Sequence, residues 1–324
     1  MHRLLIAGRA HDRVGTSIPE QVAVIRVESD GHFTLDGKVL EPEDVQPTLL
    51  RLDWDLMQSG HMKSVVEIIR SAQELAFVQT SAAGLDNPLF ALVRKKTLNF
   101  CNSDAQAPAI AEFVVASVLN HWQQFAVRAD HQESHRWQGV SFRELIDSNW
   151  LIIGFGNIGA RIASGVKGFE ATVTALRRNP GESVLADRSG TLADLATHLP
   201  QADVVVLACA LNEQTEGMAD AEFFRAMKPD AVFVNIARGK LVDEAALLKA
   251  LDSGQVEAAV LDVFATEPLP EDHAFWDHPR VYLTPHASNR GSGNLARGDA
   301  LFLANLNDFL ADRPLKNLVP RPGA

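Results

Sequence analysis

The feature that most constrains the fold is a series of short apolar runs that starts near residue 150 and alternates with helical patterns. Continuous rather than alternating hydrophobicity is typical of strands buried on both faces, as in a parallel sheet. The runs are WLIIGF (150–155), ATVTAL (171–176), VVVLA (204–208), AVFVNI (231–236), AAVLDV (258–263) and VYLTP (281–285). Such βα repeats predict a doubly wound α/β domain with right-handed crossovers.

The first hundred residues carry a second, looser βα pattern. Predicted strands are RLLIAG, LAFVQTSAAG with its turn, and KTLNFCN, and SGHMKSVVEIIRSAQ is a predicted helix. A long amphipathic helix is predicted over 107–127, because Pro108 suits a first helical turn. A further helix is predicted near the end of the chain, over 293–312.

The composition argues against several classes of protein. The net charge of −11 and pI near 5.4 argue against a nucleic-acid or anionic membrane surface. Cys101 and Cys209 are too few for a disulfide scaffold, and their apolar contexts predict small buried hydrophobes. The amino-terminal apolar run is too short for a signal peptide, and no run reaches the ~20 residues of a membrane span. A cytoplasmic location is therefore expected.

A glycine pattern directly follows the first of these runs. Gly154, Gly156 and Gly159 stand in G-x-G-x-x-G spacing between a predicted strand and a predicted helix, with Phe155, Asn157 and Ile158 as the intervening residues. In that context the first glycine makes a tight turn, the second admits a pyrophosphate and the third allows close helix–strand packing. The helix amino terminus adds free N–H groups. We predict that all six residues contact a dinucleotide.

The second strand of this unit ends in two arginines, Arg177 and Arg178. An acidic residue usually binds the adenosine ribose hydroxyls there, whereas guanidinium groups suit a 2′-phosphate. The sequence therefore favours NADP(H), with Arg177 as the more direct contact. NAD(H) stays an alternative if both arginines are merely solvated surface residues.

These patterns predict two domains. Residues 105–289 would form a Rossmann dinucleotide-binding domain, inserted into a smaller flavodoxin-like α/β substrate-binding domain made of residues 1–104 and 290–324. A cleft is expected at the junction.

Three charged residues follow three different predicted strands. Arg238, Glu267 and His286 each come just after a strand, and ligands of open α/β sheets bind outside the carboxyl ends of strands. Reduction of a 2-oxo acid needs a cation for the carboxylate and ketone, and an acid for the developing alkoxide. Arg238 would supply the first and His286 the second, with Glu267 orienting the ring. Asp262 would reach the nicotinamide amide.

Each of these side chains has an ordinary structural alternative when taken singly. Arg238 suits an ion pair, Glu267 a solvated loop and His286 a helix cap or core site. Their joint position beside a nucleotide site favours catalysis. No metal-ligand spacing, P-loop or G-x-S-x-G pattern is present in the sequence.

At the level of motifs the chain resembles the D-isomer-specific 2-hydroxyacid dehydrogenases. The resemblance covers roughly residues 75–290 in family order. It is carried by NSDAQAPAIAE, LIIGFGNIGARIA, VVVLACALNEQTEGM, AMKPDAVFVNIARGKLVDEAALLKAL, AAVLDVFATEPLP and YLTPHAS. It implies that Arg238 binds substrate, that His286 is the acid/base with Glu267 as its partner, and that the backbone amides of Ala83 and Gly84 hold the substrate carboxylate. D stereochemistry and a homodimer through the nucleotide domains are likewise implied.

Further predicted cofactor contacts come from Ala210, Thr215, Ala237 and Asp262. The family commonly has proline where this chain has Ala210, and the first seventy residues match only loosely. The leading prediction is an NADPH-dependent reductase of glyoxylate or hydroxypyruvate. The alternatives are an NAD-linked D-2-hydroxyacid or D-3-phosphoglycerate dehydrogenase and a dinucleotide-sensing corepressor. For a phosphorylated substrate, the basic residues of the smaller domain are Arg9, Arg13, Arg51, Lys63 and Arg70.

Overall fold

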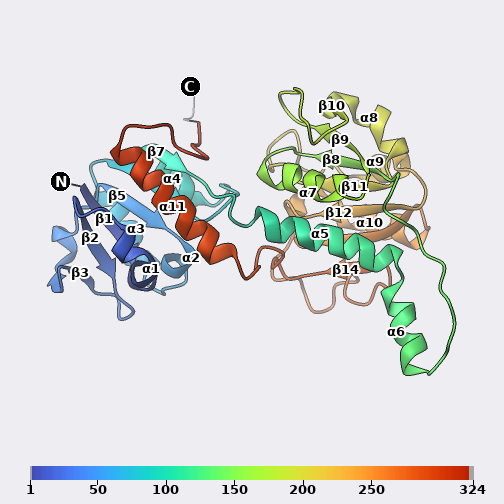
Figure 1. The fold of residues 1–324 in the computed structure, drawn as a ribbon, viewed down its shortest axis with the longest axis horizontal. Helices are drawn as coiled ribbons and strands as arrows, with labels where there is room; N and C mark the ends of the chain where they lie inside the picture. The colour runs from blue at the N-terminus through green and yellow to red at the C-terminus, as the bar shows by residue number, and fades with distance from the viewer. Residues whose placement is uncertain (1, 321–324) are drawn as a thin grey trace. The chain divides into compact units, whose positions relative to one another are not determined.

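The computed structural model describes residues 2–320 and divides into two compact units (Figure 1). Unit 1 contains the residues up to Ala105 and from Ser292 onward, and unit 2 contains Gln106–Gly291. These boundaries fall one or two residues after those expected from the sequence. Residues 1 and 321–324 of the predicted smaller domain lie outside the described residues.

Unit 2 is built on a parallel seven-stranded sheet of order β10-β9-β8-β11-β12-β13-β14. The strands are β8 (Asn149–Ile153), β9 (Thr172–Leu176), β10 (Arg188–Gly190), β11 (Val204–Leu207), β12 (Ala231–Asn235), β13 (Val256–Leu261) and β14 (Val281–Leu283). The order is that of a Rossmann sheet, 3-2-1-4-5-6, with one further strand at the end. The predicted fold class is confirmed.

Helices cover both faces of this sheet, which explains the continuous apolar runs. Ile152 packs in one buried cluster and the next residue, Ile153, in the other, because successive strand side chains point to opposite faces. The α-helices are α5 (Ala107–Trp122), α6 (Phe125–Glu133), α7 (Asn157–Lys167), α8 (Leu195–His198), α9 (Ala221–Ala226) and α10 (Glu244–Asp252). The 3₁₀ turns are Leu192–Asp194, Leu199–Gln201 and Gly239–Leu241.

The prediction of one long helix over 107–127 is wrong. Helix α5 ends at Trp122, Gln124 adopts a left-handed backbone with φ 54°, and α6 follows as a separate helix. Trp122 is the last buried residue of α5, whereas Phe125 and Val127 are exposed. Beyond Trp122 there is no core for the helix to pack on, and α6 runs away from the sheet of its unit (Figure 1).

Unit 1 is built on a mostly parallel sheet of order β4-β3-β2-β1-β5-β6-β7. The strands are β1 (His2–Ala7), β2 (Val22–Val27), β3 (Phe33–Leu35), β4 (Lys38–Leu40), β5 (Leu49–Leu52), β6 (Leu75–Thr80) and β7 (Thr97–Cys101). The parallel strands have the flavodoxin-like order 2-1-3-4-5, and the antiparallel β3–β4 hairpin extends the edge.

Helix α11 (Asn294–Leu310) joins the end of the chain to unit 1. Phe302 and Leu306 are fully buried in its core, and Asp299 forms ion pairs with Arg13 and the buried Arg51. The remaining α-helices are α1 (Gly8–Val14), α2 (Trp54–Met57), α3 (Met62–Ser71) and α4 (Pro88–Lys96). Two 3₁₀ turns, Gly15–Ser17 and Pro42–Asp44, complete the unit.

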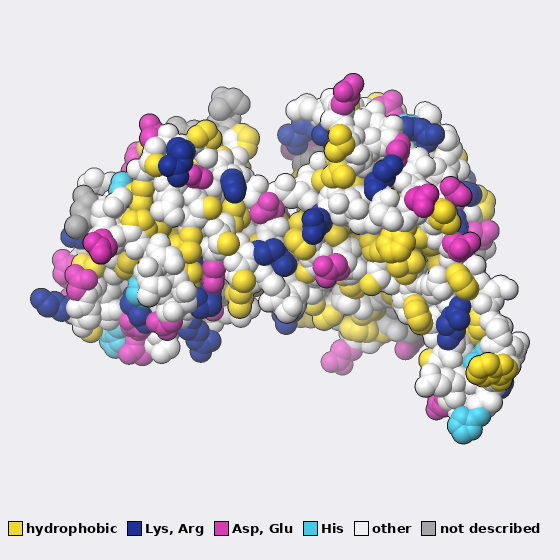
Figure 2. All heavy atoms as spheres, viewed as in Figure 1, with side chains coloured by type: hydrophobic (Ala, Val, Ile, Leu, Met, Phe, Trp, Pro, Cys, Tyr) yellow, Lys and Arg dark blue, Asp and Glu magenta, His cyan; other side chains and the backbone are white. Residues whose placement is uncertain are grey.

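Acidic and basic side chains are interspersed on the face shown in Figure 2. Within residues 2–320, no helix combines the length and apolar character needed to cross a membrane. Cys101 is buried and Cys209 partly buried, and neither forms a disulfide. Burial raises the pKa of the Cys101 thiol to about 12 and that of Cys209 to about 11.

Candidate active site

The carboxyl ends of the unit 2 strands lie along one edge of the sheet because the strands are parallel. The glycine loop follows β8 and the two arginines follow β9. Arg238 follows β12, and Glu267 and His286 follow β13 and β14. Residues far apart in sequence are therefore brought to the same edge of unit 2.

The three glycines of the loop after β8 have three different environments. Gly154 has φ +99°, and a Cβ there would overlap the backbone of Ala208 and Cys209. A Cβ at Gly159 would overlap the carbonyl oxygen of Gly154, whereas a Cβ at Gly156 would meet nothing within 4 Å. The first and third positions therefore need glycine for folding, and the second leaves open space at the start of α7, which suits a pyrophosphate.

A cavity of about 690 Å³ lies beside this loop. Of the predicted cofactor contacts, those that line it are Gly154, Phe155, Gly156, Arg177, Arg178, Ala210 and Thr215. Asn157, Ile158 and Gly159 form the first turn of α7, next to this lining. Ala237 and Asp262 lie after β12 and β13, outside the lining of the cavity.

The two arginines differ in their surroundings. Arg177 donates from Nη2 to the carbonyl of Gly181, and its guanidinium carbon lies 5.9 Å from the Phe155 ring centroid. Its Nε is buried without a hydrogen-bond partner in the described part of the chain. Arg178 is exposed.

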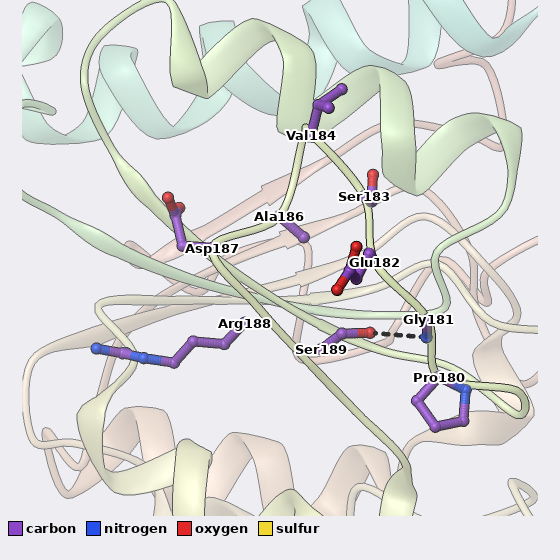
Figure 3. A pocket seen from close by; sticks show the side chains of 9 residues that line it. All are labelled: Pro180, Gly181, Glu182, Ser183, Val184, Ala186, Asp187, Arg188 and Ser189. Carbon is purple, nitrogen blue, oxygen red and sulfur yellow. Dashed lines mark hydrogen bonds between the residues drawn. The ribbon is translucent and has the colours of Figure 1, made fainter.

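The loop between β9 and β10 supplies the Gly181 carbonyl that accepts the bond from Arg177. Figure 3 shows the side chains of this loop. Gly181 donates its N–H to Ser189 Oγ over 3.5 Å, and a Cβ at Gly181 would come within 3.0 Å of Arg177 Nη2. The loop lines a second, open cavity of about 650 Å³, which includes Arg188.

Thr215 is buried and also lines the cofactor cavity. Its Oγ1 donates to the Ala210 carbonyl over 2.8 Å and accepts the Asn212 N–H over 2.9 Å. These bonds fix the turn after β11.

Asn235 and Gly239, which the sequence interpretation did not single out, position Arg238. The buried Asn235 side chain donates to the Arg238 carbonyl over 2.9 Å and accepts the Ala237 N–H over 3.1 Å. A Cβ at Gly239 would overlap the backbone of Phe264, so the loops after β12 and β13 pack directly together. The signal for Asn235 was its amide at the end of an otherwise apolar run.

His286 and Glu267 contact each other. His286 Nδ1 lies 2.9 Å from Glu267 Oε2, and the other oxygen, Oε1, accepts the Phe264 N–H over 3.0 Å. The carboxylate therefore leaves the Nε2 side of the ring for a reacting group. His286 has φ 50°, a left-handed conformation that costs about 1–2 kcal/mol in a residue with a Cβ. Its N–H donates to the Asp262 carbonyl over 2.8 Å.

The carboxylate of Asp262 organises the segment that carries His286. Asp262 is 2% exposed, and its Oδ1 accepts hydrogen bonds from Thr284 Oγ1 and from the N–H groups of Ala287 and Ser288. Oδ2 accepts a further bond from Ser288 Oγ. In this arrangement the side chain holds the backbone on both sides of His286.

In unit 1, Ala83 and Gly84 lie in the loop after β6, which the resemblance assigns to the substrate carboxylate. The Ala82 carbonyl accepts the Ser103 N–H over 2.9 Å, and the Ala83 carbonyl accepts Asn102 Nδ2 over 2.9 Å. Neither the Ala83 nor the Gly84 N–H donates to an acceptor within residues 2–320. No group of His, Cys, Asp or Glu side chains in that range is suited to a metal ion.

Comparison with known proteins assigns the sequence of unit 2 to a family. The profile described as D-isomer specific 2-hydroxyacid dehydrogenase, NAD binding domain, matches residues 115–288. The chain belongs to this family. As a D-2-hydroxyacid dehydrogenase it is an NAD(P)-linked oxidoreductase of small 2-oxo and 2-hydroxy acids.

Individual relatives carry different names. Glyoxylate/hydroxypyruvate reductase A of Serratia proteamaculans is 28% identical over 76% of this chain and 78% of its own. D-3-phosphoglycerate dehydrogenase of Mycobacterium bovis is 31% identical over 76% of this chain but only 48% of its own. The D-isomer specific 2-hydroxyacid dehydrogenase of Xanthobacter autotrophicus, solved in complex with NADPH and MES, is 25% identical. It superposes with a TM-score of 0.77 over 99% of this chain and 98% of that one.

Proposed function

We propose that this dehydrogenase reduces a small 2-oxo acid of the glyoxylate or hydroxypyruvate type with NADPH, giving the D-2-hydroxy acid. The observation that carries the cofactor preference is the pair of arginines after β9, which line the cofactor cavity where an acidic residue would select NAD. The names of the Serratia relative and of the NADPH-bound Xanthobacter structure support the same reading.

The residues present fit an NADP molecule. The open space over Gly156 suits the pyrophosphate, and the guanidinium of Arg177, a residue that lines the cavity, suits the 2′-phosphate of the ribose. Arg178, exposed at the mouth, adds a second positive charge. A charge-assisted hydrogen bond contributes about 1.5–3 kcal/mol, which corresponds to roughly ten- to a hundredfold discrimination between cofactors.

Each catalytic side chain then has one task. The bound cofactor supplies a hydride to the carbonyl carbon of the substrate. Arg238 holds the carboxylate and polarises the carbonyl, and His286 gives its Nε2 proton to the carbonyl oxygen, which becomes the hydroxyl. Glu267 holds the opposite side of the ring at Nδ1 and stabilises its positive charge before transfer. The amides of Ala83 and Gly84 are proposed to bind the substrate carboxylate.

The phosphoglycerate alternative receives less support from unit 1. A phosphorylated substrate needs available cations, yet Arg13 is paired with Asp55 and Asp299, and Arg51 is 4% exposed and paired with Asp53. The other three basic residues considered for this role, Arg9, Lys63 and Arg70, are exposed. The NAD-linked activity and the corepressor alternative are therefore kept as outcomes of the test.

The test compares initial rates of glyoxylate and hydroxypyruvate reduction with NADPH and NADH. We expect the wild type to prefer NADPH by tenfold or more, and Arg177→Asp to erode that preference. Arg188→Asp is the matched control, because Arg188, the first residue of β10, lines the neighbouring cavity but not the cofactor cavity.

Equal rates with both cofactors would contradict the NADPH proposal and favour an NAD-linked dehydrogenase. Cofactor binding without turnover of either acid would favour another 2-oxo acid or a sensor. A homodimer formed through unit 2 and a cytoplasmic location are part of the same proposal. Light scattering of the purified protein checks the dimer.

A further inference from the structure

The loop proposed to bind the substrate carboxylate is anchored by its carbonyl groups. Ala82 O accepts the backbone N–H of Ser103, and Ala83 O accepts the side-chain amide of Asn102, each over 2.9 Å. Both donors come directly after β7, the strand next to β6. Two successive peptide planes of the loop are therefore fixed from the β7 side.

This anchoring sets the direction of the two amides. In a trans peptide the carbonyl and the following N–H point in opposite directions, and no cis bond occurs in this loop. The Ala83 N–H therefore points away from Ser103, and the Gly84 N–H points away from Asn102. Both N–H groups therefore point away from the β7 side, where an anion would accept hydrogen bonds from them.

Asn102 is itself held tightly. Its N–H donates to the Asn317 carbonyl over 3.1 Å, and its carbonyl accepts Gln79 Nε2 over 2.9 Å. Gln79 is 3% exposed and accepts a bond of 2.7 Å at Oε1 from the fully buried Asn305 of α11. The Asn102 side chain therefore acts from a rigid base rather than from a free loop.

We infer that Asn102 is a positioning residue for substrate: its side-chain amide turns the Ala83–Gly84 peptide so that the Gly84 N–H faces the substrate carboxylate. The inference rests on the proposed function of this loop. Only an amide or another donor can do this, because the acceptor is a carbonyl oxygen. A carboxylate at position 102 would repel that oxygen and tilt the peptide.

The chain offers a matched control three residues earlier in β7. Asn99 Nδ2 donates to the Ala76 carbonyl over 2.9 Å, so it makes the same kind of bond at the same distance. This bond joins β7 to β6, whereas the Asn102 bond joins the segments that follow these two strands. Asn99 lies away from the Ala83–Gly84 loop. A purely structural role for Asn102 predicts that Asn102→Asp and Asn99→Asp behave alike.

The experiment measures KM, kcat and melting temperature for the wild type, Asn102→Asp and Asn99→Asp with NADPH and glyoxylate or hydroxypyruvate. A calorimetric titration of each protein with oxalate, a small dicarboxylate, measures anion binding directly. For Asn102→Asp we expect KM and the oxalate Kd to rise roughly tenfold, about the effect of one hydrogen bond to a charged group. The Kd for NADPH should stay unchanged, and Asn99→Asp should leave KM unchanged.

Each result decides the inference. The positioning role is overturned if Asn102→Asp has the same KM and oxalate Kd as the wild type. It is also overturned if Asn99→Asp changes these values to a similar extent. If the wild type reduces neither acid, the proposed function fails, and the oxalate titration decides alone. Oxalate binding that Asn102→Asp weakens supports the inference, and no binding to the wild type overturns it. If Asn102→Asp does not fold, Asn102→Ala takes its place.

Discussion

The two units use the same architecture in different ways. Both contain parallel strands with functional candidates after their carboxyl ends, but unit 2 presents side chains there, namely Arg238, Glu267 and His286. Unit 1 presents the backbone N–H groups of Ala83 and Gly84. A site made of side chains can be recognised from the residue types in the sequence. A site made of backbone amides cannot, because it depends on how neighbouring hydrogen bonds orient the peptide.

The largest effect is expected when a side chain is removed from the unit 2 site. We expect Arg238→Ala to lower kcat/KM about 10²–10³-fold or more, the usual effect of losing a group that stabilises developing charge. NADPH binding, measured by fluorescence titration, should be unchanged. Lys240→Ala, an exposed cation two residues later, is the control. Full activity in Arg238→Ala would remove this residue from the mechanism.

A second prediction concerns two glycines of the unit 2 loop after β8, Gly156 and Gly159, whose surroundings differ. Gly159→Ala should lower the free energy of unfolding by about 1–3 kcal/mol, because its Cβ overlaps the Gly154 carbonyl. Gly156→Ala should fold normally, since its Cβ meets no atom within 4 Å, yet bind NADPH roughly tenfold more weakly. Thermal unfolding and cofactor titration separate the two effects. Normal NADPH binding by Gly156→Ala would argue against a pyrophosphate there.

The smallest expected effect concerns one buried carboxylate in each unit. Burial raises the pKa of Asp203, but hydrogen bonds from Lys228 and the Asn149 N–H, with the nearby Arg143, outweigh it, so the pKa lies below its ordinary value of 3.8. For Asp299, burial is likewise outweighed by bonds from Arg13 and Arg51. A lowered pKa in the folded state stabilises the protein above the unfolded pKa.

This stability is therefore present above about pH 4 and is lost as pH falls through the lower folded values. We expect the melting temperature to drop by a few degrees per lost interaction as pH is lowered from 5 to 3. Asp203→Asn and Asp299→Asn should start from a lower melting temperature at pH 7 and decline less steeply. An unchanged slope in both variants would show that other groups govern the acid transition.

The sequence predicted unit 2 better than unit 1 for a physical reason. Six of the seven unit 2 strands read as apolar runs, and all six appear within about two residues of their predicted ends. The seventh, β10 (Arg188–Gly190), was not predicted because its first two residues are polar and exposed. In unit 1, β2 and β5 contain Arg26 and Arg51, which break the pattern. The β3–β4 hairpin was missed although its Asp36-Gly37 turn, with both φ values positive, carries a typical hairpin signal.

The candidate site shows the same division. Arg238, Glu267 and His286 were found because each is a charged residue just past an apolar run. The contact of His286 with Glu267 at 2.9 Å is observed, while the catalytic roles stay predictions. Asn102 and Asn235 were not predicted as site residues, because their side chains form hydrogen bonds to backbone groups of neighbouring loops. For Asn235 the one signal in the sequence is an amide at the end of an otherwise apolar run, which does not show what the side chain binds.

The packing of Gly239 against the Phe264 backbone has a consequence for laboratory evolution of this enzyme. Any side chain at position 239 would push apart the loop that carries Arg238 and the loop that leads to Glu267. In a recombination library these two segments should therefore survive best when they are inherited together from one parent. Diversity aimed at new substrates is better spent elsewhere in the chain.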